Sequence, residues 1–317
     1  MVLRRNSQIN QCLQLHQLLQ LLQHTFGPKV RLIACQVGNQ HHDYLVLLVQ
    51  LDRPSIQVVV KLAGPQAVMA CPFDRTAMLH RLVAARTTIP MPEVLAVNMS
   101  CQTWPWRYSI KMHVPGQEWA VVRRQMSKED LSSAYQQIGN AVAQLHAIHF
   151  PTFGELDVDG VVQGDGPYFT ALTEHARVSI KRARLRDLFL SVLDEHRHLF
   201  LDVGQASLCH EDLHRHNILF QYRQGQWRLA TILDFDKAWA GHHETDLARL
   251  DLWKGMTSNE FWSSYEALCR IEPLYEQRRP IYQLLWCLEY AQPTAEHLAD
   301  TQRLCAKLGL PRLERFE

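Results

Sequence analysis

Three consecutive apolar runs constrain the fold of this chain more than any other feature. They occupy residues 30–38 (VRLIACQVG), 43–51 (DYLVLLVQL) and 56–62 (IQVVVKL), and each is short and rich in β-branched and aliphatic residues. Turn-forming residues separate them, among them Gly38-Asn39 and the Asp-Arg-Pro-Ser stretch at 52–55. Such lengths and breakers are typical of β-strands joined by tight turns. The sequence therefore predicts an antiparallel meander in this part of the chain.

The pattern changes along the rest of the chain. A helix is expected over 73–87, and two more strands, EVLAVNM and RYSIKMHV, precede Pro115-Gly116. Beyond this point apolar residues recur at helical spacing, first over 127–149, which opens with a capping box. The part from Thr245 onward is also predicted to be helical, with breaks near Pro273, Pro280, Pro293 and Pro311. We therefore expect an α+β fold with a sheet-rich lobe over residues 1–115 and a larger helical lobe over 116–317.

The start of the chain allows two interpretations. No acidic residue precedes Asp43, and acid-poor, arginine-containing starts occur in organelle transit peptides. Apolar residues nevertheless recur there at helical spacing among glutamines, at Ile9, Cys12, Leu15, Leu18, Leu19 and Leu22. This periodicity favours an amphipathic helix that packs on the domain.

Composition argues against several classes of protein. The 317 residues include 33 Lys and Arg and 32 Asp and Glu, which gives a formal net charge of +1. Proteins that bind nucleic acid or anionic membranes usually carry a clear basic excess, so neither is expected as a partner. No apolar run approaches the roughly 20 residues of a membrane span. The 8 cysteines form no C-x-x-C pair, and we expect a soluble, cytoplasmic protein with reduced thiols.

The segment LCHEDLHRHNILF, residues 208–220, fits two incompatible patterns. The His-Glu-x-x-His that begins at His210 matches a zinc-protease motif, which needs both histidines on one face of a helix. The spacing His210-x-Asp212-x-x-x-x-Asn217 matches a kinase catalytic loop. The flanking residues ASLC and NILFQY look like strands, and no clear third zinc ligand follows on a helix. We therefore prefer the kinase interpretation.

Phosphoryl transfer from a nucleotide to an alcohol requires several groups in one cleft. A carboxylate must orient the attacking hydroxyl and accept its proton, a role that suits Asp212. Oxygen ligands must hold Mg²⁺; Asn217 follows five residues later, and Asp234 follows a buried run in ATILDFDKAW. A lysine must contact the phosphates, and Lys61 ends the apolar run VVVK. These residues together predict a Mg²⁺-dependent kinase.

These segments resemble the aminoglycoside phosphotransferase family of small-molecule kinases, distant relatives of protein kinases. The family's catalytic loop is commonly His-Gly-Asp-Leu-His-x-x-Asn, and this chain departs from it only at Glu211. Its metal segment, Ile-Asp-Trp/Phe-x-x-Ala…Gly…Asp-Leu-Ala, is similar to residues 231–248 here. IPMPEVLAV, YSIKMHVPGQEW and QLHAIH also resemble family segments, so the similarity extends from about Val30 to Arg249.

The resemblance implies a two-lobed, protein-kinase-like fold in which the second lobe carries the catalytic loop 208–220 and the metal segment 231–248. Asp212 would be the catalytic carboxylate, and Asn217 and Asp234 would bind Mg²⁺, with ATP or GTP as the phosphoryl donor. The nucleotide would contact Lys61, Gly38 and the hinge residues Lys111, Met112, His113 and Val114. Structural roles beside the site would fall to His210, Asp236 and Asp246.

Two positions depart from the family's pattern. The glutamate that usually pairs with the strand lysine is replaced by Thr76, for which Asp74 or Glu93 would have to substitute. The turn expected to cover the phosphates, CQVGNQHHDY, contains a single glycine. These departures leave open a nucleotide-binding relative that is not catalytic. Protein kinase activity is disfavoured, because the stretch between Asp234 and Asp246 is too short for a regulated activation segment.

The fold family does not determine the acceptor. An aminoglycoside-type antibiotic is the first expectation, which would make the chain an antibiotic-resistance enzyme. The alternatives are an amino alcohol, a sugar, a macrolide or another small metabolite. The carboxylates that could bind a polycation are Asp251, Glu260 and Glu289, although helical spacing also suits solvated faces. Besides nucleotide and acceptor, no obligate protein partner is expected.

Overall fold

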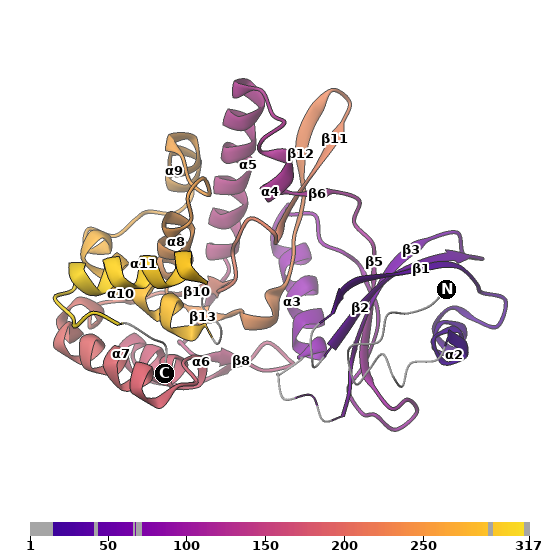
Figure 1. The fold of residues 1–317 in the computed structure, drawn as a ribbon, viewed down its shortest axis with the longest axis horizontal. Coiled ribbons are helices and arrows are strands. Elements are labelled where there is room, and N and C mark those ends of the chain that lie inside the picture. The colour runs from indigo at the N-terminus through magenta and orange to yellow at the C-terminus, as the bar shows by residue number, and fades with distance from the viewer. Residues whose placement is uncertain (1–14, 41–43, 66, 68–71, 291–293, 314–317) are drawn as a thin grey trace. The chain divides into compact units, whose positions relative to one another are not determined.

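The structure, a computed structural model, describes residues 15–40, 44–65, 67, 72–290 and 294–313. The chain forms two compact units (Figure 1). The first comprises the described residues up to Ala85 together with Pro90–Gly116, and the second comprises Arg86–Ile89 and the residues from Gln117 onward. The first contains an antiparallel sheet and the second is mostly helical, so the predicted α+β fold class is confirmed.

A five-stranded antiparallel sheet with the strand order β1-β2-β3-β5-β4 forms the first unit. Its strands are β1 (Arg31–Gln40), β2 (Tyr44–Asp52), β3 (Gln57–Ala63), β4 (Val94–Asn98) and β5 (Arg107–Met112). Alternate residues of β2 are fully buried, from Leu45 to Leu51, as period-two alternation requires of a sheet with one covered face. The meander predicted for the first three strands is therefore confirmed.

Two helices belong to this unit. The first, α2 (Leu15–Phe26), buries Leu18, Leu21 and Leu22 in the same apolar cluster as the buried face of the sheet. Full burial of such a side chain stabilises a fold by about 1.5–3 kcal/mol, which explains why the amphipathic pattern forms a helix here. Ile9 and Cys12 lie outside the described residues. The second helix, α3 (Phe73–Arg86), matches the expected span.

Small antiparallel sheets hold the loops of the second unit. One has the order β12-β11-β6, a second has the order β13-β10-β7, and β8 pairs with β9. Their bounds are β6 Gln117–Glu118, β7 His149–Phe150, β8 Glu155–Leu156, β9 Val162–Gln163, β10 Ala206–Cys209, β11 Ile218–Arg223, β12 Gln226–Ile232 and β13 Trp239–Gly241. The strands predicted on both sides of the segment 208–220 are therefore confirmed as β10 and β11.

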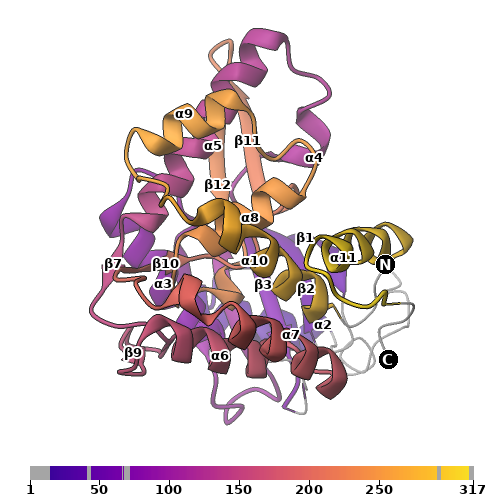
Figure 2. The same cartoon turned by 90° about the vertical axis from the view of Figure 1, so that its left-hand side faces the viewer.

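Helices make up most of the second unit. They are α4 Trp119–Val122, α5 Lys128–His146, α6 Tyr168–Ser179, α7 Ala183–Glu195, α8 Glu244–Leu252, α9 Asn259–Glu266, α10 Tyr275–Glu289 and α11 Ala295–Lys307, with 3₁₀ turns η1 Arg197–Phe200 and η2 Phe235–Lys237. Figure 2 shows α7, α8 and α11 around α10, with which all three are in contact. At the start of α5, Ser127 Oγ accepts a hydrogen bond from the Asp130 amide at 3.1 Å, as the capping box predicts. None of the helices in the described part of the chain is long and apolar enough to cross a membrane.

One predicted helix break is wrong. Pro280 lies inside α10 instead of ending a helix. A proline there removes one backbone hydrogen bond and disfavours the helix by about 3 kcal/mol. The helix continues because the residues that follow, Ile281, Leu284, Leu285 and Leu288, are all buried, and their combined burial outweighs that loss. Pro293 lies outside the described residues.

Candidate active site

The segment between β10 and β11 is an irregular loop, without the helix that a zinc protease would need. Glu211 adopts the left-handed conformation, with φ at 59°. His210 is fully buried, and its Nε2 donates to the Leu233 carbonyl oxygen at 2.9 Å while its Nδ1 accepts from the Asp212 amide at 3.1 Å. Both ring nitrogens are therefore occupied by backbone groups. His210 positions the loop, and its imidazole is not available as a metal ligand.

Asp246 fixes the backbone of the loop between β10 and β11. This fully buried carboxylate accepts hydrogen bonds from the His210 amide at 2.6 Å and from the Glu211 amide at 2.8 Å. His146 Nε2 lies 3.2 Å from the same carboxylate, and Tyr265 donates its hydroxyl to His146 Nδ1 at 2.8 Å. Burial alone would raise the pKa of Asp246, but the hydrogen bonds from His146 and His210 outweigh it and lower the pKa. The loop therefore rests on an ionised carboxylate.

Asp212 lies at the partly exposed end of this loop, with 23% of its side chain accessible. Burial raises the pKa of Asp212, whereas the positive charges of Lys237 and Arg249 lower it. Together these charges outweigh burial, so the pKa lies below its usual value. Lys237 Nζ and Arg249 Nη1 are each 3.9 Å from Asp212 Oδ1. Asp212 is therefore a carboxylate at neutral pH, the form that can orient a hydroxyl and accept its proton.

Asn217 and Asp234 lie at the adjoining ends of two paired strands. β11 begins next to Asn217 and β12 ends two residues before Asp234, and the Leu233 amide donates to the Asn217 carbonyl oxygen at 2.8 Å. The Asn217 side-chain nitrogen donates to the Asp212 carbonyl oxygen at 2.9 Å, which leaves the side-chain oxygen for another ligand. Asp234 is in the left-handed region, with φ at 67°, a conformation that for a residue other than glycine is found mainly at turns and functional sites. An amide oxygen and a carboxylate are ligands that fit Mg²⁺.

Asp236, which follows Asp234 by two residues, lies in the 3₁₀ turn η2 and is half-buried. Its position beside the candidate metal ligands agrees with a structural role, which stays a prediction.

A group of charged residues behind Asp212 was not predicted from the sequence. Arg249, on α8, is buried with 2% of its side chain exposed, and its Nη2 lies 3.4 Å from Glu211 Oε2 and 3.6 Å from Glu289 Oε2. Glu211 Oε1 in turn accepts a hydrogen bond from Trp239 Nε1 at 3.1 Å. Glu211, the one departure from the family's loop, is thus explained by a buried cation on the same helix as Asp246.

The three carboxylates suggested for acceptor binding each have a separate partner. Asp251 pairs with Arg279 at 2.9 Å, and Glu260 accepts a hydrogen bond from Ser258 Oγ at 2.7 Å. Glu289 lies 3.4 Å from Lys237 Nζ. The structure gives no cluster of these three residues, and their role in acceptor binding stays a prediction.

Lys61 lies on β3 of the first unit, where its Nζ is 4.7 Å from the centre of the Tyr44 ring and 5.8 Å from that of Phe73. Both aromatic faces stabilise the ammonium group through cation–π interactions. Thr76 is buried on α3, at the position where the family has a glutamate. Gly38 lies exposed in β1, and a Cβ at this position would make only ordinary contacts.

The hinge segment, Lys111–Val114, begins in the last two residues of β5 and continues just beyond it. Two of its amides are already committed within the first unit, because Met112 donates to the Glu93 carbonyl oxygen at 2.8 Å and His113 donates to the Gln57 carbonyl oxygen at 2.9 Å. The Lys111 ammonium lies 3.3 Å from His80 Nε2. The Val114 amide makes no backbone hydrogen bond among the described residues.

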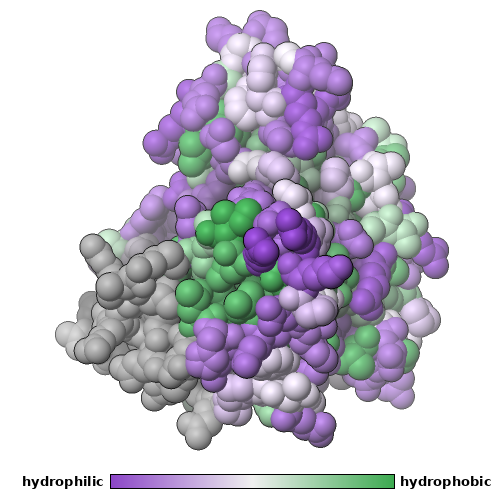
Figure 3. All heavy atoms as spheres, turned by 90° about the vertical axis from the view of Figure 1, so that its right-hand side faces the viewer, coloured by the Kyte–Doolittle hydropathy of each residue, from purple (hydrophilic) through white to green (hydrophobic). Residues whose placement is uncertain are grey.

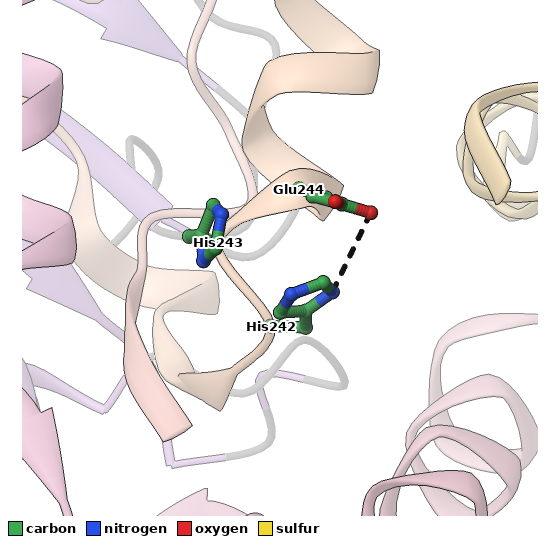
Figure 4. Close-up of side chains that lie close together, drawn as sticks. All are labelled: His242, His243 and Glu244. Carbon is green, nitrogen blue, oxygen red and sulfur yellow. Dashed lines mark ion pairs between the residues drawn. The ribbon is translucent and has the colours of Figure 1, made fainter. Parts of the chain in front are cut away.

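Two further clusters contain potential metal ligands among the described residues. Figure 4 shows the first, His242, His243 and Glu244, where an ion pair of 3.7 Å joins His242 to Glu244. The Glu244 carboxylate, however, accepts hydrogen bonds from Arg278 Nε at 2.7 Å and Nη2 at 2.8 Å. Two charge-assisted bonds of this kind already satisfy the carboxylate, so this cluster is an internal ion pair.

The second cluster combines His175 with Glu211 and Glu289. His175 stacks on Trp239 with ring centres 4.1 Å apart and lies 2.9 Å from Glu155 Oε1. Burial lowers the pKa of His175, but the hydrogen bond to Glu155 and the charge of Glu211 outweigh it and raise the pKa. A proton on this imidazole competes with any metal, so the cluster too is held by hydrogen bonds and ion pairs.

Two hollows occur within single units. One of about 200 Å³ in the second unit is lined by His175 and Trp239 together with Glu155, Asp165 and Glu174. One of about 680 Å³ in the first unit lies between α2 and the residues around Val30, and none of the predicted site residues lines it. Apolar side chains of this unit, such as Leu15 and Ile33, are exposed. On the face drawn in Figure 3, hydrophobic residues (green) lie among hydrophilic ones (purple).

Comparison with known proteins gives a family and a fold. A family model described as the phosphotransferase enzyme family (APH) matches residues 10–280. No curated protein sequence matches the chain.

Among solved structures, the complex of aminoglycoside phosphotransferase APH(4)-Ia with ADP and hygromycin B has a TM-score of 0.64 at 16% identity and covers 92% of this chain and 96% of its own. The GDP and kanamycin complex of APH(2")-IIia has a TM-score of 0.61 at 13% identity and covers 93% and 98%. An ethanolamine kinase from Plasmodium vivax has a TM-score of 0.55 at 13% identity and covers 90% and 83%. At these identities the likeness establishes a kinase-like fold.

Proposed function

The chain belongs to the phosphotransferase enzyme family, and on that premise we propose that it transfers the γ-phosphoryl group of ATP or GTP to a hydroxyl group of a small molecule. The observation that carries this proposal is Asp212. It is partly exposed, its pKa is lowered, and hydrogen bonds from buried residues fix the loop that bears it. Asn217 and Asp234, two oxygen donors suited to Mg²⁺, belong to the same pair of strand ends.

In the proposed reaction, the acceptor hydroxyl donates a hydrogen bond to Asp212. Its oxygen then forms a bond to the γ-phosphorus, the bond from that phosphorus to the bridging oxygen breaks, and the proton passes to the Asp212 carboxylate. Asn217 and Asp234 would hold Mg²⁺, which neutralises charge on the nucleotide phosphates. Lys61 would contact those phosphates, and the hinge residues Lys111–Val114 would contact the base.

The first candidate acceptor is an aminoglycoside-type antibiotic. The support is that the similar structures described above contain hygromycin B or kanamycin together with a nucleotide. A small amino alcohol is the second candidate, because an ethanolamine kinase has the same fold. A nucleotide-binding protein without catalysis is the alternative to both.

The test is phosphate transfer from ATP and from GTP, with Mg²⁺, to a panel of aminoglycosides, other hydroxylated antibiotics, amino alcohols and sugars. Transfer to a panel member above the rate without acceptor is the expected result, and it names the substrate class. Nucleotide binding without transfer to any member would contradict the proposal and favour the non-catalytic alternative. The same assay with Asp212→Ala separates transfer at this site from a contaminating activity.

A further inference from the structure

The charges next to Asp212 restrict the acceptors that the site can take, and this inference rests on the proposed phosphoryl transfer. Two carboxylates near Asp212, those of Glu211 and Glu289, both face the buried guanidinium of Arg249, at 3.4 and 3.6 Å. That guanidinium also lies 5.4 Å from the centre of the Trp286 ring. Both carboxylates are therefore paired with Arg249. An ammonium group of an acceptor would have to displace Arg249 in order to bind Glu211 or Glu289.

Lys237 is the most exposed of the three groups that lie within ion-pair distance of Asp212, the others being His214 and Arg249. Its Nζ lies 3.9 Å from Asp212 Oδ1 and 3.4 Å from Glu289 Oε2, and 51% of its side chain is exposed, compared with 7% for Glu289. Burial lowers the pKa of Lys237, but the carboxylates of Glu289 and Asp212 outweigh it, and the pKa is raised. The accessible charge at this edge of Asp212 is therefore an ammonium group.

The geometry places this ammonium group next to the reacting hydroxyl. A hydroxyl that donates to Asp212 has to lie within about 2.6–3.2 Å of the carboxylate. Lys237 Nζ, at 3.9 Å from Asp212 Oδ1, is too far for a direct hydrogen bond. No ligand atom fits on the line between two atoms this close, but an oxygen to one side of that line can lie about 2.8 Å from both. The substituent on the carbon next to the reacting hydroxyl is then within reach of Lys237.

We propose that Lys237 is a specificity-determining residue, which selects acceptors that carry an oxygen on the carbon next to the reacting hydroxyl and rejects acceptors that carry an ammonium group there. An oxygen accepts a hydrogen bond from the Lys237 ammonium group. An acceptor ammonium group at that carbon cannot accept this hydrogen bond and meets a like charge at about 4 Å, a repulsion that corresponds to about fivefold in binding. The acceptor is thus a vicinal diol at its reacting end, as in a sugar ring, and ethanolamine is a poor substrate.

The test compares matched acceptors that differ in one substituent. Glycerol is paired with 2-amino-1,3-propanediol, and ethylene glycol is paired with ethanolamine. The acceptor found in the panel is paired with its analogue that has an amino group in place of the hydroxyl next to the phosphorylated position. We measure kcat/KM for each pair with the wild type, Lys237→Met and Lys237→Glu. Lys128→Met, at the exposed start of α5, is the matched control.

We expect the wild type and Lys128→Met to prefer the hydroxyl partner by about fivefold or more. Lys237→Met should remove the preference, and Lys237→Glu should reverse it. A wild-type preference for the amino partner, or a preference that is the same in all variants, would overturn the inference and leave the phosphotransferase assignment intact. Absence of transfer to every acceptor would instead overturn the proposed function, and the inference with it.

Discussion

Asp212 and the residues that contact it show how single side chains are tuned in this site. Asp212 keeps its charge because Lys237 and Arg249 oppose the effect of burial on its pKa. Its backbone amide is held by His210, and the His210 amide is held by Asp246. The position of the carboxylate therefore depends on a chain of hydrogen bonds that ends at a fully buried residue.

Replacing Asp212 with alanine should strongly reduce turnover while nucleotide binding is retained. Because the carboxylate would orient the hydroxyl and accept its proton, we expect kcat to fall by roughly 10²–10⁴-fold. The nucleotide Kd, measured by calorimetry, should stay close to that of the wild type. Transfer by Asp212→Ala at the wild-type rate would show that another group is the base.

His243 makes the stability of the protein depend on pH. Burial and, to a smaller extent, the neighbouring His242, His146 and Arg278 lower its pKa to about 2, and its Nε2 has no hydrogen-bond partner among the described residues. Below the ordinary pKa of about 6.5, the unfolded chain binds a proton that the folded chain does not. The contribution of His243 to the free energy of unfolding is therefore fully retained above this pH. It is lost as the pH is lowered, by up to about 1.4 kcal/mol per pH unit.

His243→Phe should reduce this dependence, because phenylalanine has no proton to bind in either state. The measurement is the free energy of unfolding in urea at pH 7.5 and at pH 5, with the exposed His149→Phe as control. We expect the loss of stability between the two pH values to be smaller for His243→Phe than for the wild type and the control. An unchanged difference would assign the pH dependence to other groups.

Among the elements, the pair formed by α5 and α9 shows why a glycine stands inside a long helix. Glycine disfavours a helix by about 1 kcal/mol relative to alanine, yet Gly139 lies in the middle of α5. A Cβ at this position would clash with the Phe261 carbonyl oxygen on α9. The absence of a side chain thus allows the two helix backbones to approach each other, and α9 carries the Tyr265 hydroxyl that supports His146 and Asp246.

Gly139→Ala should destabilise the protein by about 1–3 kcal/mol through overpacking, in spite of the better helix propensity of alanine. Urea unfolding measures the change. Gly204→Ala is the matched control, because a Cβ at Gly204 has no atom within 4 Å, and we expect a change below about 0.5 kcal/mol there. Equal stability of the wild type and Gly139→Ala would mean that α9 moves away without loss.

At the scale of the whole molecule, the predicted nucleotide contacts come from both compact units. Lys61 and the hinge belong to the first unit, and Asp212, Asn217 and Asp234 belong to the second. A nucleotide that binds only the folded protein stabilises it by about 2.7 kcal/mol at one hundred times its Kd. Such a ligand should raise Tm by a few degrees for a protein of this size.

The prediction is that Mg²⁺ and a non-hydrolysable ATP analogue raise Tm together and that EDTA removes most of the increase. Asp234→Ala should show a smaller increase at the same ligand concentrations, since it lacks a proposed metal ligand. Asp159→Ala, in an exposed turn, should behave as the wild type. An identical increase for Asp234→Ala would exclude Asp234 from metal–nucleotide binding.

The sequence by itself determined the elements whose signals are local. Alternating burial in β2 and β3, the capping box of α5 and the strands on both sides of the loop 210–217 follow from residues close together in the chain. Motif spacing likewise identified Asp212, Asn217 and Asp234 as one set, and the structure brings Asn217 within 3.3 Å of Asp212. Their chemical roles stay predictions.

Only the tertiary structure decided the surroundings of Asp212. Arg249 pairs with Glu211 and Glu289, and Lys237 lies between Glu289 and Asp212, although these residues come from different elements. No local pattern predicts such contacts, because their energy depends on burial and distance after folding. Pro280 gives the same lesson, since a local signal for a helix break was overridden by the buried face of α10. Local propensities specify elements, whereas packing decides which charges meet.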